Sequence, residues 1–298
     1  MFNRISANII FQKLILPAVL ILLWTGIGQA SKKDNNHYFE PLQQKLIQDG
    51  FDSQEINKLY ERPEVYFESD GVALLFTYSE SKVDYGQFSN DWSIQRAKEY
   101  MEIYKEDLER TEKAYGVDKN VITAILLVES GLGKTLGTRS ALNTLSTLAA
   151  LMYPDARREF YGMIPKAKRP QRKKFEKSAK RRSKWAYGEL KALLTYADQQ
   201  NFDPAEMPGS FAGAMGLAQF MPTSILAYGR DGDNNGSIDL LIHADAMASI
   251  ANYLKKHGWR PGISRKKAEK IIYHYNHSKY YVKAILKIAD RLESSIDA

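Results

Sequence analysis

The chain has no cysteine among its 298 residues. This absence excludes disulfide bonds, zinc sites built on thiolates, a cysteine nucleophile and a lipid attached through a cysteine side chain. A chain of this length still buries enough apolar surface to fold around one substantial core without covalent or metal staples. The absence of cysteine therefore excludes thiol-based catalysis and thiol-based metal binding, but it does not exclude an enzyme.

Long apolar runs are also missing. The longest, residues 14–27, falls short of the ~20 residues that a membrane-spanning helix needs. It follows Arg4 and Lys13 and leads to Gly28-Gln29-Ala30, a small-x-small pattern typical of cleavage before Ser31. We interpret residues 1–30 as a signal peptide and expect an exported protein, with an uncleaved membrane anchor as the alternative.

Acidic residues are scarce in one segment of the chain. The formal net charge is +7, of which the leader contributes +2, so the mature chain carries +5. Residues 166–184 contain eleven Lys or Arg and one acid, Glu176, a net of +10, which leaves −5 for the rest. Such a segment is either a solvated or disordered surface, or a binding site for an acidic wall polymer or anionic membrane lipid. An exported protein would not use it for nucleic acid.

Alternating apolar patterns long enough for a sheet are lacking, and apolar residues recur at helical spacing instead. We expect a mainly α fold, in which residues 64–90 form a loop with one extended piece. The expected helices are two short ones within 39–60, then 92–115, one that starts after Asp118 and ends at Glu129, 142–153, 185–200, 244–257 and 266–292.

Glu129 is a lone carboxylate that ends the apolar run 121–128 and precedes a glycine-rich turn. Apolar neighbours and the negative end of a helix dipole both penalise the ionised form, so both would raise its pKa toward values useful for proton donation. The alternative is a glutamate that points into water at a helix end.

A second notable stretch, residues 209–222, is crowded with glycine and alanine and also contains Ser210 and Gln219. Small residues let a ligand or a second helix lie against the main chain, and the two polar side chains suit a sugar. Composition alone leaves a tight helix-packing corner as an equal alternative.

Four stretches together resemble, in order and approximate spacing, the signatures of the lytic murein transglycosylase B family. They are residues 129–137, residues 209–222, Asn252-Tyr253 ahead of His257-Gly258-Trp259, and residues 275–281. The similarity runs from about residue 39 to residue 291. The resemblance implies a lysozyme-like helical core, residues 91–298, after an additional N-terminal helical part, residues 31–90.

The resemblance also implies a periplasmic enzyme that cuts peptidoglycan glycan strands between N-acetylmuramic acid and N-acetylglucosamine and forms a 1,6-anhydro sugar. Glu129 would be the single general acid and base. A conventional glycosidase needs two carboxylates, and the matched signatures offer no obvious second one. Eight further residues are implied as substrate ligands: Ser210, Gln219, Tyr253, Tyr275, Asn276, Tyr281, Arg157 and Arg158.

Residues 231–239 match the front of an EF-hand calcium loop, with oxygen ligands at the expected spacing. Position twelve is Ile242 where an EF-hand has a glutamate, so the strict motif fails. The resemblance implies a lengthened loop, residues 231–245. A structural Ca²⁺ would then be held by Asp231, Asp233, Asn235, Ser237 and Asp245. A turn without an ion is the alternative, and no cofactor is expected for catalysis.

Two other functions remain open at the level of sequence. One is a hydrolytic muramidase that uses water, and the other is a non-catalytic peptidoglycan-binding scaffold. The presence of Glu129 argues against the scaffold, because a protein without activity would tolerate loss of its acid.

Overall fold

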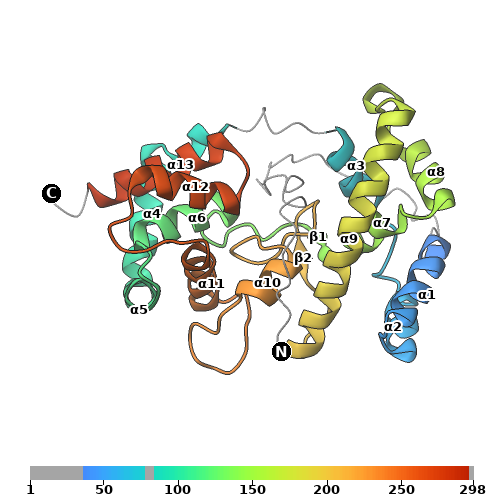
Figure 1. Cartoon of the computed structure of the whole chain (residues 1–298), viewed down its shortest axis with the longest axis horizontal. Coiled ribbons are helices and arrows are strands. Elements are labelled where there is room, and N and C mark those ends of the chain that lie inside the picture. The colour runs from blue at the N-terminus through green and yellow to red at the C-terminus, as the bar shows by residue number, and fades with distance from the viewer. Residues whose placement is uncertain (1–35, 78–83, 295–298) are drawn as a thin grey trace, which may run out of the picture.

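The computed structural model describes residues 36–77 and 84–294, so the expected leader lies outside the described residues. Figure 1 shows two groups of helices, one with α1–α3 and α7–α9 and one with α4–α6 and α11–α13, and α10 with two short strands between them. The elements are η2 (Asn36–Phe39), α1 (Glu40–Gln48), α2 (Ser53–Tyr60), α3 (Ser69–Thr77), η4 (Tyr85–Phe88), α4 (Asp91–Ile103), α5 (Lys105–Tyr115), α6 (Lys119–Ser130), β1 (Arg139–Ser140), α7 (Ala141–Ala150), α8 (Pro154–Met163), η5 (Lys166–Lys168), α9 (Arg172–Gln200), β2 (Pro208–Gly209), α10 (Pro222–Tyr228), α11 (His243–Lys256), α12 (Arg265–Tyr275) and α13 (Lys279–Glu293).

The two central helices are α6 and α7. Residues 121–130 of α6 and all residues of α7 are buried, as expected for helices that are apolar on every side. The helix α13 packs along α6, and α9 packs along α7. The end of α6, where Glu129 lies, is therefore held inside the protein rather than at its surface.

The N-terminal part packs on this core through the expected pair of short helices. Leu42 and Leu46 of α1 and Ile56 and Tyr60 of α2 are buried, and the Tyr60 hydroxyl lies 2.7 Å from Ser146 Oγ on α7. The prediction of a loop over residues 64–90 is wrong, because α3 and η4 lie there. Short helices of nine and four residues give too few turns for a period to show in the sequence.

Two expected long helices are each divided in two. The first breaks at Tyr104, where the ring packs at 4.6 Å from Tyr100 and 4.3 Å from His243 between ring centroids. The second breaks at Asn276, after which the Ser278 side chain accepts a hydrogen bond from the Tyr281 amide and begins α13. Neither break is marked by proline or glycine, so the apolar spacing continues through both.

The basic segment 166–184 is largely helical, so the disordered alternative is wrong. Residues 166–168 form a short 3-10 turn, and α9 begins at Arg172 and continues without interruption into the expected helix 185–200. Phe175, Ala179 and Arg182 are buried and fix one face of this half of the helix to the core. The many charged residues made this buried face hard to recognise in the sequence. The division into residues 31–90 and 91–298 remains a prediction.

None of the helices within residues 36–77 and 84–294 is both long and apolar enough to span a membrane.

Candidate active site

Glu129 is the next-to-last residue of α6, and only 4% of it is exposed. Its Oε1 accepts a hydrogen bond of 2.7 Å from the Tyr281 hydroxyl on α13. Burial raises the pKa of Glu129 to about 8, and the Tyr281 hydrogen bond works in the opposite direction because it stabilises the carboxylate. The direction of this shift agrees with the one expected from the apolar run, and a carboxyl group with such a pKa holds its proton at neutral pH.

A stack of tyrosines surrounds this carboxyl group. The rings of Tyr275 and Tyr281 are nearly parallel, with centroids 6.3 Å apart, and Tyr85 meets Tyr281 edge-on at 6.2 Å. Burial, with Glu129 nearby, raises the pKa of both Tyr275 and Tyr281 well above the usual value. Both hydroxyls therefore stay protonated and can act only as neutral hydrogen-bonding groups near Glu129.

The Tyr275 hydroxyl connects the acid to the small-residue stretch, because it donates a 2.6 Å hydrogen bond to the Ala218 carbonyl. This stretch starts at β2, which pairs antiparallel with β1. At Gly137, just before β1, a side chain would place its Cβ 2.1 Å from the Gly209 carbonyl oxygen, and φ is +98°. Only glycine fits there, so the close approach of the two segments depends on it.

Ser210 and Gln219 shape this stretch internally. The Ser210 Oγ accepts hydrogen bonds from the amides of Ala212 and Ala214 at 3.2 and 3.1 Å, which fixes the turn. Gln219 has a positive φ of 46°, and its Nε2 donates to the Gly216 carbonyl at 2.9 Å. Both side chains are buried.

Two buried acceptors near Tyr275 are unused. Within the described residues, Gln219 Oε1 and Asn276 Oδ1 have no hydrogen-bond partner. Gln219 follows Ala218, which binds Tyr275, and Asn276 follows Tyr275 in the chain. Buried amide oxygens normally have partners, so both are free to accept from a ligand hydroxyl or N–H group.

Tyr253 is 6% exposed and belongs to an aromatic cluster rather than to an open wall. Its hydroxyl donates to the His274 carbonyl at 2.7 Å, and its ring meets Tyr275 at 5.1 Å and Phe220 at 5.7 Å between centroids. The direct effect of Tyr253 is to hold Tyr275 in place.

The two implied arginine ligands lie in different surroundings. Arg157 is buried, pairs with Glu176 of α9 at 2.6 Å and donates to the carbonyls of Leu151 and Met152. Its guanidinium therefore joins α8 to the start of α9. Arg158 is exposed and pairs with Asp155 at 2.7 Å. Neither contacts the tyrosines around Glu129 through any interaction seen in the described residues.

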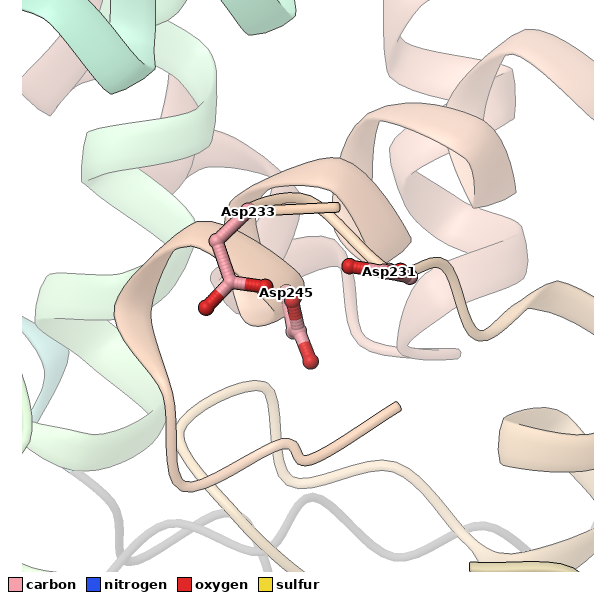
Figure 2. A group of neighbouring side chains, drawn as sticks. All are labelled: Asp231, Asp233 and Asp245. Atoms are coloured by element: carbon pink, nitrogen blue, oxygen red, sulfur yellow. The ribbon is translucent and has the colours of Figure 1, made fainter. Parts of the chain in front are cut away.

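The expected metal loop brings its carboxylates together. Asp231, Asp233 and Asp245 each place one oxygen within 4.8 Å of the others (Figure 2). Asp245 is fully buried and accepts the amides of Gly232 and Asp239, both at 2.7 Å. Burial raises the pKa of Asp245, and its two acidic neighbours act in the same direction. Three acids at this spacing, with oxygen as the donor atom, suit a hard cation such as Ca²⁺.

Asn235 and Ser237 belong to the same turn. The Asn235 Oδ1 accepts from both the amide and the hydroxyl of Ser237, at 2.8 and 2.7 Å. Asp231 accepts the Gly236 amide at 2.8 Å, which closes the loop on itself. The ligand set predicted from the sequence therefore comes from one compact segment.

Sequence reasoning missed Tyr85 and the ion pair between Glu68 and Arg139. Glu68 is buried and binds Arg139 of β1 at 2.6 Å, so the segment before α3 is tied to the strand beside the small-residue stretch. These residues lie 71 positions apart, and Tyr85 lies far from Tyr281 in the chain. No local spacing could have signalled such contacts.

Comparisons with known proteins agree with this architecture. Residues 34–269 match the transglycosylase SLT domain. Membrane-bound lytic murein transglycosylase B of Escherichia coli (strain K12) is 34% identical over 170 residues, which are 57% of this chain and 40% of that relative. The chain thus matches less than half of the length of this curated relative.

Solved structures share the fold. Soluble lytic transglycosylase SltB1 from Pseudomonas aeruginosa has a TM-score of 0.71 at 24% identity and covers 88% of this chain and 99% of its own. Escherichia coli lytic transglycosylase Slt35 in complex with calcium has a TM-score of 0.70 at 22% identity, with 89% of this chain and 95% of that chain covered. The predicted mainly α, lysozyme-like fold is confirmed. Because the domain match spans most of the chain, the chain belongs to the transglycosylase SLT domain family.

Proposed function

We propose that the protein is a peptidoglycan lytic transglycosylase that cleaves the β-1,4 bond between N-acetylmuramic acid and N-acetylglucosamine. One observation carries the proposal: Glu129 is a buried, protonated carboxyl group at the end of α6, bound by Tyr281, in a chain of this family. A neutral carboxylic acid at neutral pH is the group that a glycosidic oxygen needs as it departs.

The reaction that follows uses one carboxyl group twice. Glu129 donates its proton to the glycosidic oxygen as the bond from that oxygen to C1 of muramic acid breaks. The C6 hydroxyl of the same sugar then attacks C1, and the Glu129 carboxylate takes its proton. The product is a 1,6-anhydro sugar, and the acid is regenerated. Because the attacking hydroxyl is tethered to the reacting sugar, no activated water is required.

The hydrolytic alternative needs a second carboxylate about 5–9.5 Å from the first. Burial and the Tyr281 hydrogen bond are the causes of the shift in the pKa of Glu129. The other buried carboxylates have fixed partners: Glu68 binds Arg139, Glu189 binds Thr223 and Asp245 binds loop amides. These facts favour the transglycosylase over a muramidase.

We assign substrate contacts to the polar groups around Glu129. Gln219 and Asn276 offer free amide oxygens for sugar hydroxyls or an N-acetyl N–H. Tyr275 and Tyr281 are buried, so they support the site through their hydroxyls, which bind the Ala218 carbonyl and Glu129, rather than offer ring faces to a sugar. Ser210 shapes the main chain beside them. Arg157 and Arg158 would reach the substrate only if they left Glu176 and Asp155.

The test is mass spectrometry of fragments released from purified sacculi. The wild-type protein is expected to release 1,6-anhydro-muramic products, and Glu129→Gln is expected to lose at least about 10²–10⁴-fold in rate, because the proton donor is gone. Glu159→Gln, an exposed glutamate on α8, makes the same chemical change elsewhere and should keep full activity.

Reducing-end products from the wild type would instead establish a water-using muramidase. No release from folded protein, judged by its thermal unfolding, would favour the binding scaffold.

We further propose that Asp231, Asp233, Asn235, Ser237 and Asp245 hold a structural Ca²⁺. The gathering of three carboxylate oxygens within 4.8 Å supports it, as does the calcium found in the related Slt35 structure. Bound there, the ion would supply charge neutralisation and no part of bond cleavage, since the loop is a separate segment from Glu129 and its tyrosines.

We also propose an exported, periplasmic protein whose basic segment 166–184 contacts an anionic surface, either wall polymer or membrane. The signal-like leader and the +10 charge of this segment support the proposal. The related Escherichia coli protein is described as membrane-bound. A face rich in lysine and arginine is one means of attachment to an anionic surface.

A further inference from the structure

Trp92, the second residue of α4, is 64% exposed. Its indole is a large apolar group, and leaving such a surface in water forfeits the stabilisation that burial would give. A single exposed aromatic side chain needs no explanation by itself. The groups that surround Trp92, however, are those of a ligand site.

Two cations lie beside the indole. The Arg96 guanidinium carbon is 4.7 Å from a ring centroid of Trp92, and Lys134 Nζ is 5.8 Å away. Both distances fall within the range of cation–π contact. In the part of the chain that the structure describes, neither cation forms an ion pair with an acid, and Lys134 is exposed. The cluster therefore combines an exposed indole with two cations that have no acidic partner among the described residues.

This cluster is attached to the end of the helix that carries Glu129. The Arg96 Nη2 donates a 2.7 Å hydrogen bond to the carbonyl of Gly131, the residue that ends α6 in the left-handed conformation. Gly131 is two residues after Glu129, and Lys134 belongs to the same turn. The contacts thus run from the indole through the guanidinium to the turn that follows the proposed acid.

We propose that Trp92, Arg96 and Lys134 form a binding subsite for a muramic acid unit that carries its stem peptide. A pyranose ring or its N-acetyl group covers the Trp92 indole, and a carboxylate of the peptide lies against Lys134 and the free N–H groups of Arg96. This inference rests on the proposed function, since it assumes a peptidoglycan strand at Glu129.

Charge points to the stem peptide rather than to the sugars of the strand. In an intact unit the lactyl group is amide-linked and the sugars are neutral, so they satisfy the indole but leave both cations unmatched. A carboxylate of the peptide pairs with them in a site where the aromatic ring excludes part of the water. Arg96 has five N–H donors, and its one hydrogen bond to Gly131 leaves others available. The subsite should therefore distinguish strands with peptides from strands without them.

The test measures binding in the Glu129→Gln background, so that no strand is cut during titration. Solubilised glycan strands with intact stem peptides are compared with the same strands after an amidase has removed the peptides and the lactyl carboxylates that this exposes have been capped as neutral amides. We expect Trp92→Ala to weaken binding of both by about tenfold, with Trp92→Phe intermediate. Lys134→Gln should weaken binding of the peptide-bearing strands by about fivefold or more and leave the stripped strands within about twofold.

Matched controls come from exposed residues outside the cluster, Ile103→Ala on the same helix and Lys105→Gln. Both should leave binding unchanged. Unchanged binding in Trp92→Ala and Trp92→Phe would overturn the subsite. An equal loss for both kinds of strand in Lys134→Gln would overturn the peptide assignment.

The proposed function is judged separately, by the anhydro products of the wild-type protein. If those products are absent while binding still depends on Trp92 and Lys134, the reaction assignment fails and the subsite stands. If anhydro products form while binding ignores both residues, the subsite fails and the reaction stands.

Discussion

At the scale of single residues, the proposed chemistry depends on the balance between Glu129 and Tyr281. Burial stabilises the neutral acid, whereas the tyrosine hydroxyl stabilises the carboxylate through a 2.7 Å hydrogen bond. The proposed reaction needs both forms in turn, since the acid would give a proton and the carboxylate would take one back. A pKa of about 8 leaves Glu129 mostly protonated at neutral pH but still able to ionise.

Removing the tyrosine hydroxyl should shift the pH dependence of the reaction. Tyr281→Phe takes away a group that lowers the pKa of Glu129, so this pKa should rise above about 8. The acid then keeps its proton to higher pH, and the alkaline limb of the pH–rate profile for release of anhydro products should move to higher pH.

The control for this change is Tyr196→Phe, which also removes a buried hydroxyl, here one that donates to the Ile238 carbonyl. Its alkaline limb should coincide with that of the wild type. If Tyr281→Phe left the limb in place or moved it to lower pH, Glu129 could not be the group that titrates.

At the scale of helices and loops, the sequence predicted the features that depend on residues close together in the chain, but not the contacts between distant segments. The end of the helix at Glu129 and the close backbone approach along residues 209–222 were predictable, because a helix-ending glycine turn and a run of small residues are read from neighbours in the chain. The role of Tyr85 was not predictable, since its contact with Tyr281 depends on the packing of η4 against α13. The basic half of α9 was misjudged because its charges obscured the buried Phe175 and Ala179.

Helix α9 also shows how distant elements hold the site. Its buried Glu189 accepts hydrogen bonds of 2.9 Å from both the amide and the hydroxyl of Thr223, at the start of α10. Helix α10 begins where the small-residue stretch ends, at Pro222. A carboxylate at the N-terminus of a helix satisfies amides that have no partner within the helix. Glu189 thus anchors one end of the stretch that contains Gln219.

The loop at residues 231–245 gives a prediction for calcium. Removing Ca²⁺ with a chelator should lower the melting temperature by about 5–10 °C, since saturating calcium favours the folded state by about 2–3 kcal/mol through mass action. Asp245→Asn should melt at the same temperature with and without calcium, because it loses the buried carboxylate of the cluster.

Asp155→Asn, on the exposed start of α8, changes an aspartate outside the loop and should keep the full calcium response. Identical melting of the wild-type protein with calcium and with chelator would show that the loop is a turn without an ion.

At the scale of the whole molecule, charge is distributed unevenly. The mature chain carries −5 outside residues 166–184 and +10 within them. Part of that positive charge is used internally, because Arg172 pairs with Glu176, which also binds Arg157 of α8, and Arg182 is buried against Phe76. The remainder points outward from the first half of α9. Helical spacing of four, three and four residues puts four exposed lysines in one row: Lys173, Lys177, Lys180 and Lys184.

This row should bind anionic surfaces in a salt-dependent way. Replacing the four lysines together by glutamate reverses the charge of the face without touching its buried side, so folding and release of anhydro products from soluble strands should be preserved. Binding to purified sacculi or to vesicles rich in anionic phospholipid should be strong for the wild type at about 0.02 M salt and weak at about 0.3 M, where the screening length is shorter. The reversed variant should bind weakly at both.

The control reverses the same number of exposed lysines elsewhere, at Lys105, Lys113, Lys256 and Lys267. It has the same net charge as the first variant, so it separates the effect of the row from that of total charge. If binding depends on the position of the charges, the control should keep most of it on the preferred surface, and comparison of sacculi with vesicles identifies that surface. Equal loss in both variants would mean that net charge alone governs attachment, and the face on α9 would have no specific part in it.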